Sequence, residues 1–117
     1  MTVIAVQNVY VVAGDMDRAA HFYAHALGLT EKFRDGARWT QYKVGSGNFS
    51  LASAEEAGRG AATGATPVFE TDTLEETIAA VEQAGGRIVA SRDMGSHGRT
   101  ATCADPDGNI FQLFARS

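Results

Sequence analysis

The distribution of apolar residues divides the chain into two halves of similar order. Residues 3–12 are dense in β-branched side chains, a pattern typical of a buried strand. Apolar residues at helical spacing then predict a helix over about 16–27, with Asp15 as its N-cap and Gly28 just past its end. Three short strands are predicted after this helix, at 30–35, 38–44 and 48–53.

The same order returns after an Ala- and Gly-rich stretch. That stretch has no periodic pattern and is interpreted as a linker. Beyond it, a strand at 66–71 precedes a helix over about 73–84, for which Asp72 is the predicted N-cap and Glu75 occupies the capping-box position. Three further strands are predicted, at 87–91, 99–104 and 109–115.

The spacing of the helix caps supports an internal repeat. Asp15 to Gly28 and Asp72 to Gly85 are both thirteen residues apart. The sequence therefore predicts an α+β fold in a single domain, 1–117, with module one at about 1–53, a linker at about 54–65 and module two at about 66–117. Since neither half covers its own sheet completely, we expect the two sheets to surround a shared space for a ligand.

Three segments carry a resemblance to a known family. They are VVAGDMDRAAHFYAHALGL in the first half, and VFETDTLEETIAAVEQAGGRI and DPDGNIFQLF in the second. Together they resemble the glyoxalase/bleomycin-resistance/extradiol-dioxygenase proteins, also called the vicinal oxygen chelate superfamily. The resemblance implies two βαβββ modules whose curved sheets form a partly open barrel, completed in a homodimer.

The resemblance also locates the positions at which metal-using members bind a divalent ion. Four strand residues, mostly His and Glu, hold the ion in those proteins. The matching positions here are Asn8, Ser50, Thr66 and Gln112, with the second moving to Leu51 if the alignment slips by one residue. Four neutral side chains would leave a divalent cation uncompensated. We therefore expect no metal ion and no other cofactor.

Asn8 and Gln112 are amides among apolar neighbours. A buried amide without a partner costs about 1–3 kcal/mol, so both side chains need hydrogen bonds. Either the two amides bond to one another or to the backbone, or they line a neutral cavity and orient a polar ligand. Metal-free members of the bleomycin-resistance type bind and sequester a drug in such a cavity. On this interpretation Asn8, Ser50, Thr66 and Gln112 contact the ligand, and Trp39 forms an aromatic wall.

Other candidates for chemistry have two interpretations each. Glu70 lies in an apolar strand and points either into the barrel or to solvent at an edge. His97 lies in a Gly-flanked loop and is either an acid–base group at the cavity mouth or an exposed loop residue. His21 and His25 are one helical turn apart, a spacing that suits a shared metal, but a solvated polar helix face is the favoured interpretation.

Composition excludes several classes of partner. The net charge of −4 and the pI near 5.2 argue against nucleic acid. No apolar run approaches the length of a membrane span.

Cys103 is the single cysteine, which excludes an intrachain disulfide and fits a reducing compartment. Because no neighbouring residue indicates an activated thiolate, Cys103 is interpreted as a small buried residue. The N-terminal residues lack a basic signal-peptide region, so we expect a cytoplasmic protein.

Two main hypotheses for function follow. The first is a metal-independent protein that binds a small molecule, such as an antibiotic or another aromatic ligand, and so confers drug resistance. The second is an enzyme of the lyase, isomerase or dioxygenase type, with a non-standard site built on Glu70 and His97 or with metal ligands that the alignment misplaces. A regulatory domain with a filled cavity is a third, weaker hypothesis.

Overall fold

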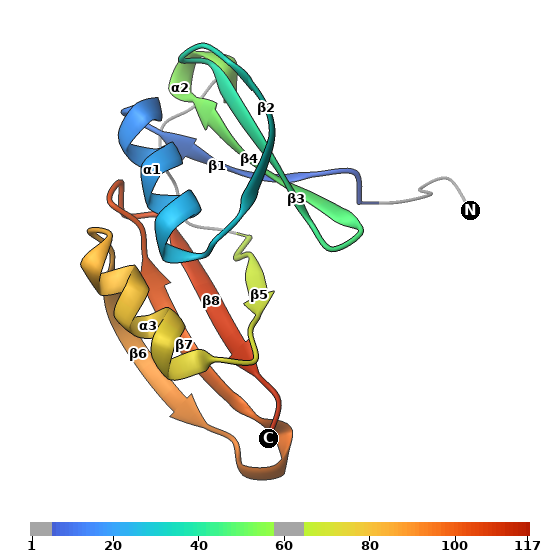
Figure 1. The fold of residues 1–117 in the computed structure, drawn as a ribbon, viewed down its shortest axis with the longest axis vertical. Helices are drawn as coiled ribbons and strands as arrows, with labels where there is room; N and C mark the ends of the chain where they lie inside the picture. Colours follow the sequence, from blue (N-terminus) through green and yellow to red (C-terminus); the bar gives the residue numbers. More distant parts are fainter. Residues whose placement is uncertain (1–5, 58–64) are drawn as a thin grey trace.

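The structure is a computed structural model that describes residues 6–57 and 65–117. It contains two four-stranded sheets, each with a helix on one face (Figure 1). The elements of module one are β1 (Val9–Ala13), α1 (Met16–Ala26), β2 (Thr30–Asp35), β3 (Trp39–Val44) and β4 (Gly47–Ser53). After α2 (Ala54–Ala57), module two contains β5 (Val68–Glu70), α3 (Leu74–Gln83), β6 (Arg87–Asp93), the single 3₁₀ turn η1 (Gly95–His97), β7 (Arg99–Ala104) and β8 (Ile110–Ala115).

The two sheets have the same topology. Their strand orders are β1-β4-β3-β2 and β5-β8-β7-β6, and in both the first strand runs parallel to the last while the other pairs are antiparallel. This repeated order confirms the predicted α+β fold of two βαβββ units. Within the described residues the sheets do not close into a barrel. No described helix is long and apolar enough to span a membrane.

Helix α1 forms as its sequence predicts. The Asp15 carboxylate accepts a hydrogen bond of 3.1 Å from the backbone N–H of Arg18, so Asp15 is the N-cap. The apolar side of the helix is buried against sheet one, where the Tyr42 hydroxyl donates to the Ala20 carbonyl. The buried residues of this side are Met16, Ala19, Ala20, Phe22, Tyr23 and Ala26.

The start of helix α3 differs from the prediction. Its N-cap is Thr73 and not Asp72, and the cap side chain makes no capping hydrogen bond. The Thr71 hydroxyl instead accepts from the backbone N–H of Thr73, at 3.1 Å. Glu75 does not complete a capping box, because its carboxylate pairs with Arg99 on β7. A competing partner from another strand thus replaced the local interaction that the motif predicted.

Three predicted boundaries also need correction. The predicted linker begins with the short helix α2, where the Ser53 hydroxyl accepts from the N–H of Glu56. Strand β1 begins only at Val9, and residues 1–5 and 58–64 lie outside the described part of the chain. Strand β5 begins only at Val68, two residues after the predicted start at Thr66. Pro67 has no N–H to donate, so it contributes only its carbonyl, which accepts from the N–H of Gln112.

An aromatic cluster fills the space between the two modules. The rings of Phe22 and Phe111 lie 6.2 Å apart, and those of Phe49 and Phe69 lie 5.1 Å apart, so both pairs connect module one to module two. Both contacts are edge-to-face, a favourable geometry for aromatic rings. Helices α1 and α3 lie side by side over this interface (Figure 1).

Hydrogen bonds from the turn at 105–109 hold the modules together at one end. Asn109 Nδ2 donates to the carbonyl of Val12 at 2.7 Å, and the backbone N–H of Gly14 donates to Asp107 Oδ1 at 3.0 Å. Arg18 also pairs with Asp107, at 3.2 Å. Each of these contacts joins the DPDGN segment of module two to the junction between β1 and α1 in module one.

The most buried contact of this junction joins Tyr23 and Asp105. The Tyr23 hydroxyl donates to Asp105 Oδ2 at 2.9 Å, and both residues are buried. Burial, with the neighbouring Asp105 carboxylate as the next cause, raises the pKa of Tyr23 well above its usual range. Burial also raises the pKa of Asp105, although its hydrogen bonds from Asn109 and Tyr23 act in the opposite direction.

Tyr23→Phe should lower the free energy of unfolding by about 1.5–3 kcal/mol, because it removes a buried hydrogen bond to a carboxylate. The matched control is Tyr42→Phe, which removes a buried hydroxyl whose partner is the neutral Ala20 carbonyl. Urea unfolding of both variants measures the difference. Equal losses would contradict the assignment of Tyr23 and Asp105 as the principal polar contact.

Stability should fall as the pH rises above about 10, the ordinary pKa of tyrosine. The pKa of Tyr23 is higher in the folded state than in the unfolded state, so its protonated hydroxyl stabilises the fold. This stabilisation is complete below the unfolded-state pKa and is lost as the pH rises through the folded-state pKa. Urea unfolding at pH 8, 10 and 11 should therefore show a steeper decline for the wild type than for Tyr23→Phe. Parallel declines would show that Tyr23 does not remain protonated in the folded state.

Candidate functional site

Each sheet has one face covered by its helix and an opposite face, called here the open face. In sheet one, strand register places Tyr10, Phe33, Gln41 and Ser50 in one row across the open face, with Trp39 on the same side. The open face of sheet two has two such rows. The first contains Val68, Gln112, Thr102 and Ala90. The second contains Glu70, Phe114, Thr100 and Arg92.

On the open face of sheet one, Gln41 joins two of the predicted site residues directly and a third through Asn8. Gln41 Oε1 accepts from Trp39 Nε1 at 3.1 Å and from Asn8 Nδ2 at 3.4 Å. Asn8 Oδ1 in turn accepts from the Ser50 hydroxyl at 3.1 Å. Sequence reasoning missed Gln41, although its place two residues after Trp39 on a predicted strand put both on one face.

Aromatic side chains surround this polar network. The Tyr10 and Trp39 rings lie 5.6 Å apart, and Phe33, in the same row as Gln41, is 48 % exposed. By contrast, Tyr42 and Phe49 are buried on the helix side of the sheet. The open face of sheet one thus offers partly exposed aromatic rings beside placed amides, a surface suited to a flat ligand.

On the open face of sheet two, Gln112 has a different set of contacts. Its Nε2 donates to the Thr102 hydroxyl at 3.1 Å, so the hydrogen bonds of Gln112 and Asn8 go to side chains of their own sheets and not to each other. Thr66, the remaining predicted position, is exposed and lies before β5. The structure therefore brings Asn8, Ser50 and Trp39 together and leaves Thr66 apart.

A hollow of about 400 Å³ lies on the open face of sheet two, with Gln112 and Thr102 in its wall. Ala90 and Met94 supply apolar surface, and Thr100 adds another hydroxyl. Arg92 is its single charged lining residue in the part of the chain that the structure describes. This hollow combines several hydrogen-bonding groups with one cation.

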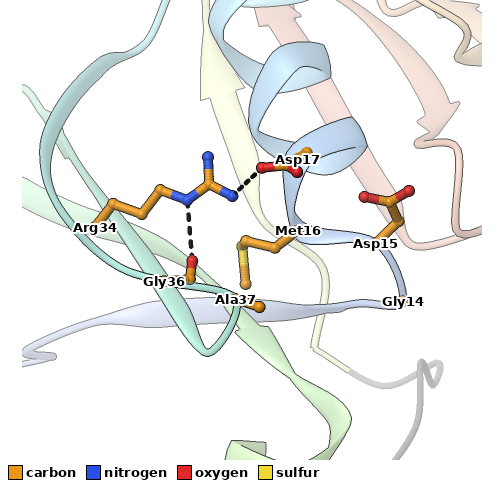
Figure 2. A pocket seen from close by; sticks show the side chains of 7 residues that line it. All are labelled: Gly14, Asp15, Met16, Asp17, Arg34, Gly36 and Ala37. Carbon is orange, nitrogen blue, oxygen red and sulfur yellow. Dashed lines mark hydrogen bonds and ion pairs between the residues drawn. The ribbon is translucent and has the colours of Figure 1, made fainter.

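A larger hollow, of about 610 Å³, lies at the N-terminal end of α1 (Figure 2). Its one arginine, Arg34, pairs with Asp17 and donates to the Gly36 carbonyl at 3.0 Å. The Asp15 carboxylate is used to cap the helix. Because Arg34, Asp15 and Asp17 already have partners, this hollow is a poor site for a charged ligand.

The candidate catalytic residues are both exposed. Glu70 shares the open face of sheet two but pairs with Arg116 at 3.0 Å. His97 lies in η1, and its ring makes no hydrogen bond or ion pair with any residue of 6–57 or 65–117. The structure therefore shows no hydrogen-bonded acid–base pair between Glu70 and His97.

The paired histidines of α1 and the single cysteine are the remaining candidates for metal binding and thiol chemistry. His21 and His25 lie on the exposed side of α1 with ring centroids 4.1 Å apart. Across the described ranges, no group of three or more His, Cys, Asp or Glu side chains is arranged to hold a metal ion. Cys103 is fully buried, and burial raises the pKa of its thiol to about 11, which makes it a poor nucleophile.

A family comparison decides the classification of the chain. The model of the Glyoxalase/Bleomycin resistance protein/Dioxygenase superfamily matches residues 5–113. The chain belongs to this superfamily. No curated protein sequence matches it significantly.

Several solved structures have a similar fold. A glyoxalase-related enzyme of Fulvimarina pelagi has a TM-score of 0.80 at 18 % identity over 97 % of this chain and 89 % of that one. An antibiotic binding protein of Streptomyces sp. CB03234 has a TM-score of 0.76 at 24 % identity over 100 % and 99 %. A fosfomycin resistance protein of Listeria monocytogenes, complexed with Mn(II), has a TM-score of 0.78 at 14 % identity over 99 % and 93 %. An enzyme and a binding protein therefore both have a fold similar to that of this chain, so the fold alone does not assign a function.

Gln41→Ala should shift the emission of Trp39, the single tryptophan, to longer wavelength and lower the free energy of unfolding by about 1–3 kcal/mol. The substitution removes the acceptor shared by Trp39 and Asn8 and admits water to the indole. Gln83→Ala on α3 is the matched control and should leave the emission unchanged. An unchanged spectrum in Gln41→Ala would contradict the network.

Proposed function

We propose that this protein binds a flat apolar or aromatic small molecule without a metal ion. The observation that carries this proposal is the neutral character of the four positions at which metal-using relatives hold their ion. Asn8 and Ser50 hydrogen-bond to each other, and Gln112 hydrogen-bonds to Thr102, so these groups are satisfied without a cation. The antibiotic binding protein of similar fold supports ligand binding as a function for such a scaffold.

The composition of the open faces supports the proposed ligand class. Tyr10, Phe33 and Trp39 offer aromatic area, from which most of the affinity of a flat ligand would come. The amides of Asn8 and Gln112 would add a few directional contacts. Since the bound molecule is held and not converted, the protein would act by sequestration, and an antibiotic is a suitable ligand.

A second copy of the chain would complete the site. Phe33 on sheet one is 48 % exposed and Val68 on sheet two is 57 % exposed, so both open faces present apolar side chains to solvent. Two copies that place the open face of one sheet against that of the other would bury these side chains and enclose the ligand. The free-energy gain from burying such apolar area favours a homodimer.

The enzyme hypothesis has less support. A general acid–base role for Glu70 requires a free carboxylate near the substrate, whereas this carboxylate pairs with Arg116. His97 has no partner in the described chain that would orient its ring. Both groups remain testable by substitution.

A screen of planar compounds with two to four fused aromatic rings, in EDTA, tests the proposal. We expect a ligand that quenches Trp39 fluorescence, binds equally well with and without EDTA, and raises the melting temperature. At a hundred times its dissociation constant it should add about 2.7 kcal/mol to the free energy of unfolding. Light scattering should give the mass of two chains.

Two results would contradict this proposal. One is a ligand that binds only when a divalent metal is added. The other is turnover of a bound compound that stops in a Glu70→Gln variant, which would favour the enzyme. A Trp39→Phe variant should lose the fluorescence signal and bind the ligand more weakly by calorimetry, because it loses aromatic area and the hydrogen bond to Gln41.

A further inference from the structure

The hollow on the open face of sheet two carries a charge that a purely apolar ligand would not use. Arg92 shares a row with Thr100, directly across the β6–β7 pair, and both line the hollow. Gln112 and Thr102 lie in the adjacent row. A guanidinium therefore stands beside two hydroxyl groups and an amide on one surface.

No carboxylate neutralises this guanidinium in the part of the chain that the structure describes. Five other arginines form ion pairs: Arg18, Arg34, Arg38, Arg99 and Arg116. Arg92 has no such partner within residues 6–57 and 65–117. The adjacent carboxylate, Asp93, instead accepts from the backbone N–H of Gly95 in the following turn.

The local charge is opposite to that of the whole protein. The chain has a formal net charge of −4, yet no described acidic residue lines this hollow. A guanidinium binds a planar oxyanion such as a carboxylate through two parallel hydrogen bonds, and the neighbouring hydroxyls can donate to the same group. A cationic hollow within an acidic protein selects for negative charge.

We propose that the ligand of this protein carries an anionic group, such as a carboxylate, sulfonate or phosphonate, which Arg92 binds beside Thr100. This inference rests on the proposed function. The flat body of the ligand occupies the aromatic part of the site, and its acidic group lies in the hollow of sheet two.

Two fluorescent probes of nearly the same shape test the inference. 8-Anilinonaphthalene-1-sulfonate carries an anionic group, whereas N-phenyl-1-naphthylamine has the same aromatic body without it. Arg92→Gln should weaken binding of the sulfonate about tenfold, the lower end expected for loss of a charged hydrogen bond at an exposed site. Binding of the neutral amine should not change.

Arg87→Gln is the matched control. Arg87 lies on the same strand, is exposed and has no ion pair among the described residues, but it does not line the hollow. This variant should bind both probes like the wild type. In the wild type, added KCl should weaken binding of the sulfonate and leave that of the amine unchanged.

The outcomes separate this inference from the proposed function. If both probes bind but Arg92→Gln leaves sulfonate binding unchanged, or weakens both probes equally, the anionic ligand is wrong and aromatic binding stands. An equal loss in Arg87→Gln would likewise overturn a specific role for Arg92. If the wild type binds neither probe, the proposed aromatic binding itself is contradicted.

Discussion

Tyr23 donates a buried hydrogen bond of 2.9 Å to Asp105, and around this contact the two modules are held in one orientation. Asn109 and Asp107 add bonds from the same turn to Val12, Gly14 and Arg18. A buried carboxylate must be hydrogen-bonded, so each module supplies what the other requires. The aromatic cluster then fills the remaining space between them. Separation of the modules would expose both the rings and the polar groups.

This arrangement explains why the motif that identifies the superfamily does not identify a function. Arg18 and Tyr23 from the first segment, and Asp105 and Asn109 from the last, all take part in the contact between modules. Their contacts join the 105–109 turn to β1 and α1, whereas Gln41, Trp39 and Arg92 on the open faces lie outside the three segments. The proposed ligand site therefore depends on side chains such as Gln41, Trp39 and Arg92, which these segments do not contain.

Runs of β-branched and aromatic residues between turn signals predicted much of the fold, and in β8 buried and half-buried side chains also alternate regularly. The strand positions, the α1 cap at Asp15 and the buried Cys103 follow from local rules. The α3 cap at Asp72 was wrong because Glu75 found a partner in Arg99, a residue distant in sequence. Such a pairing depends on tertiary structure and has no local signal.

The candidate site was less predictable for similar reasons. Asn8 and Ser50 were found through the resemblance, but their partner Gln41 was overlooked between two aromatic residues, Trp39 and Tyr42. The shift in register between Ile88 and Ala90 changes the face of every later residue of β6. Arg92 could therefore not be assigned to the open face from sequence alone.

The central claim is that the open faces hold a ligand site that does not bind a metal ion. It is tested most directly by calorimetric titration of Zn²⁺, Ni²⁺ and Mn²⁺ into a protein with His21 and His25 replaced by Asn. Those exposed histidines are one turn apart and could bind such ions independently of the site. We expect no saturable binding at micromolar concentrations. One ion bound per chain, and lost in Asn8→Ala and Gln112→Ala variants, would contradict the account.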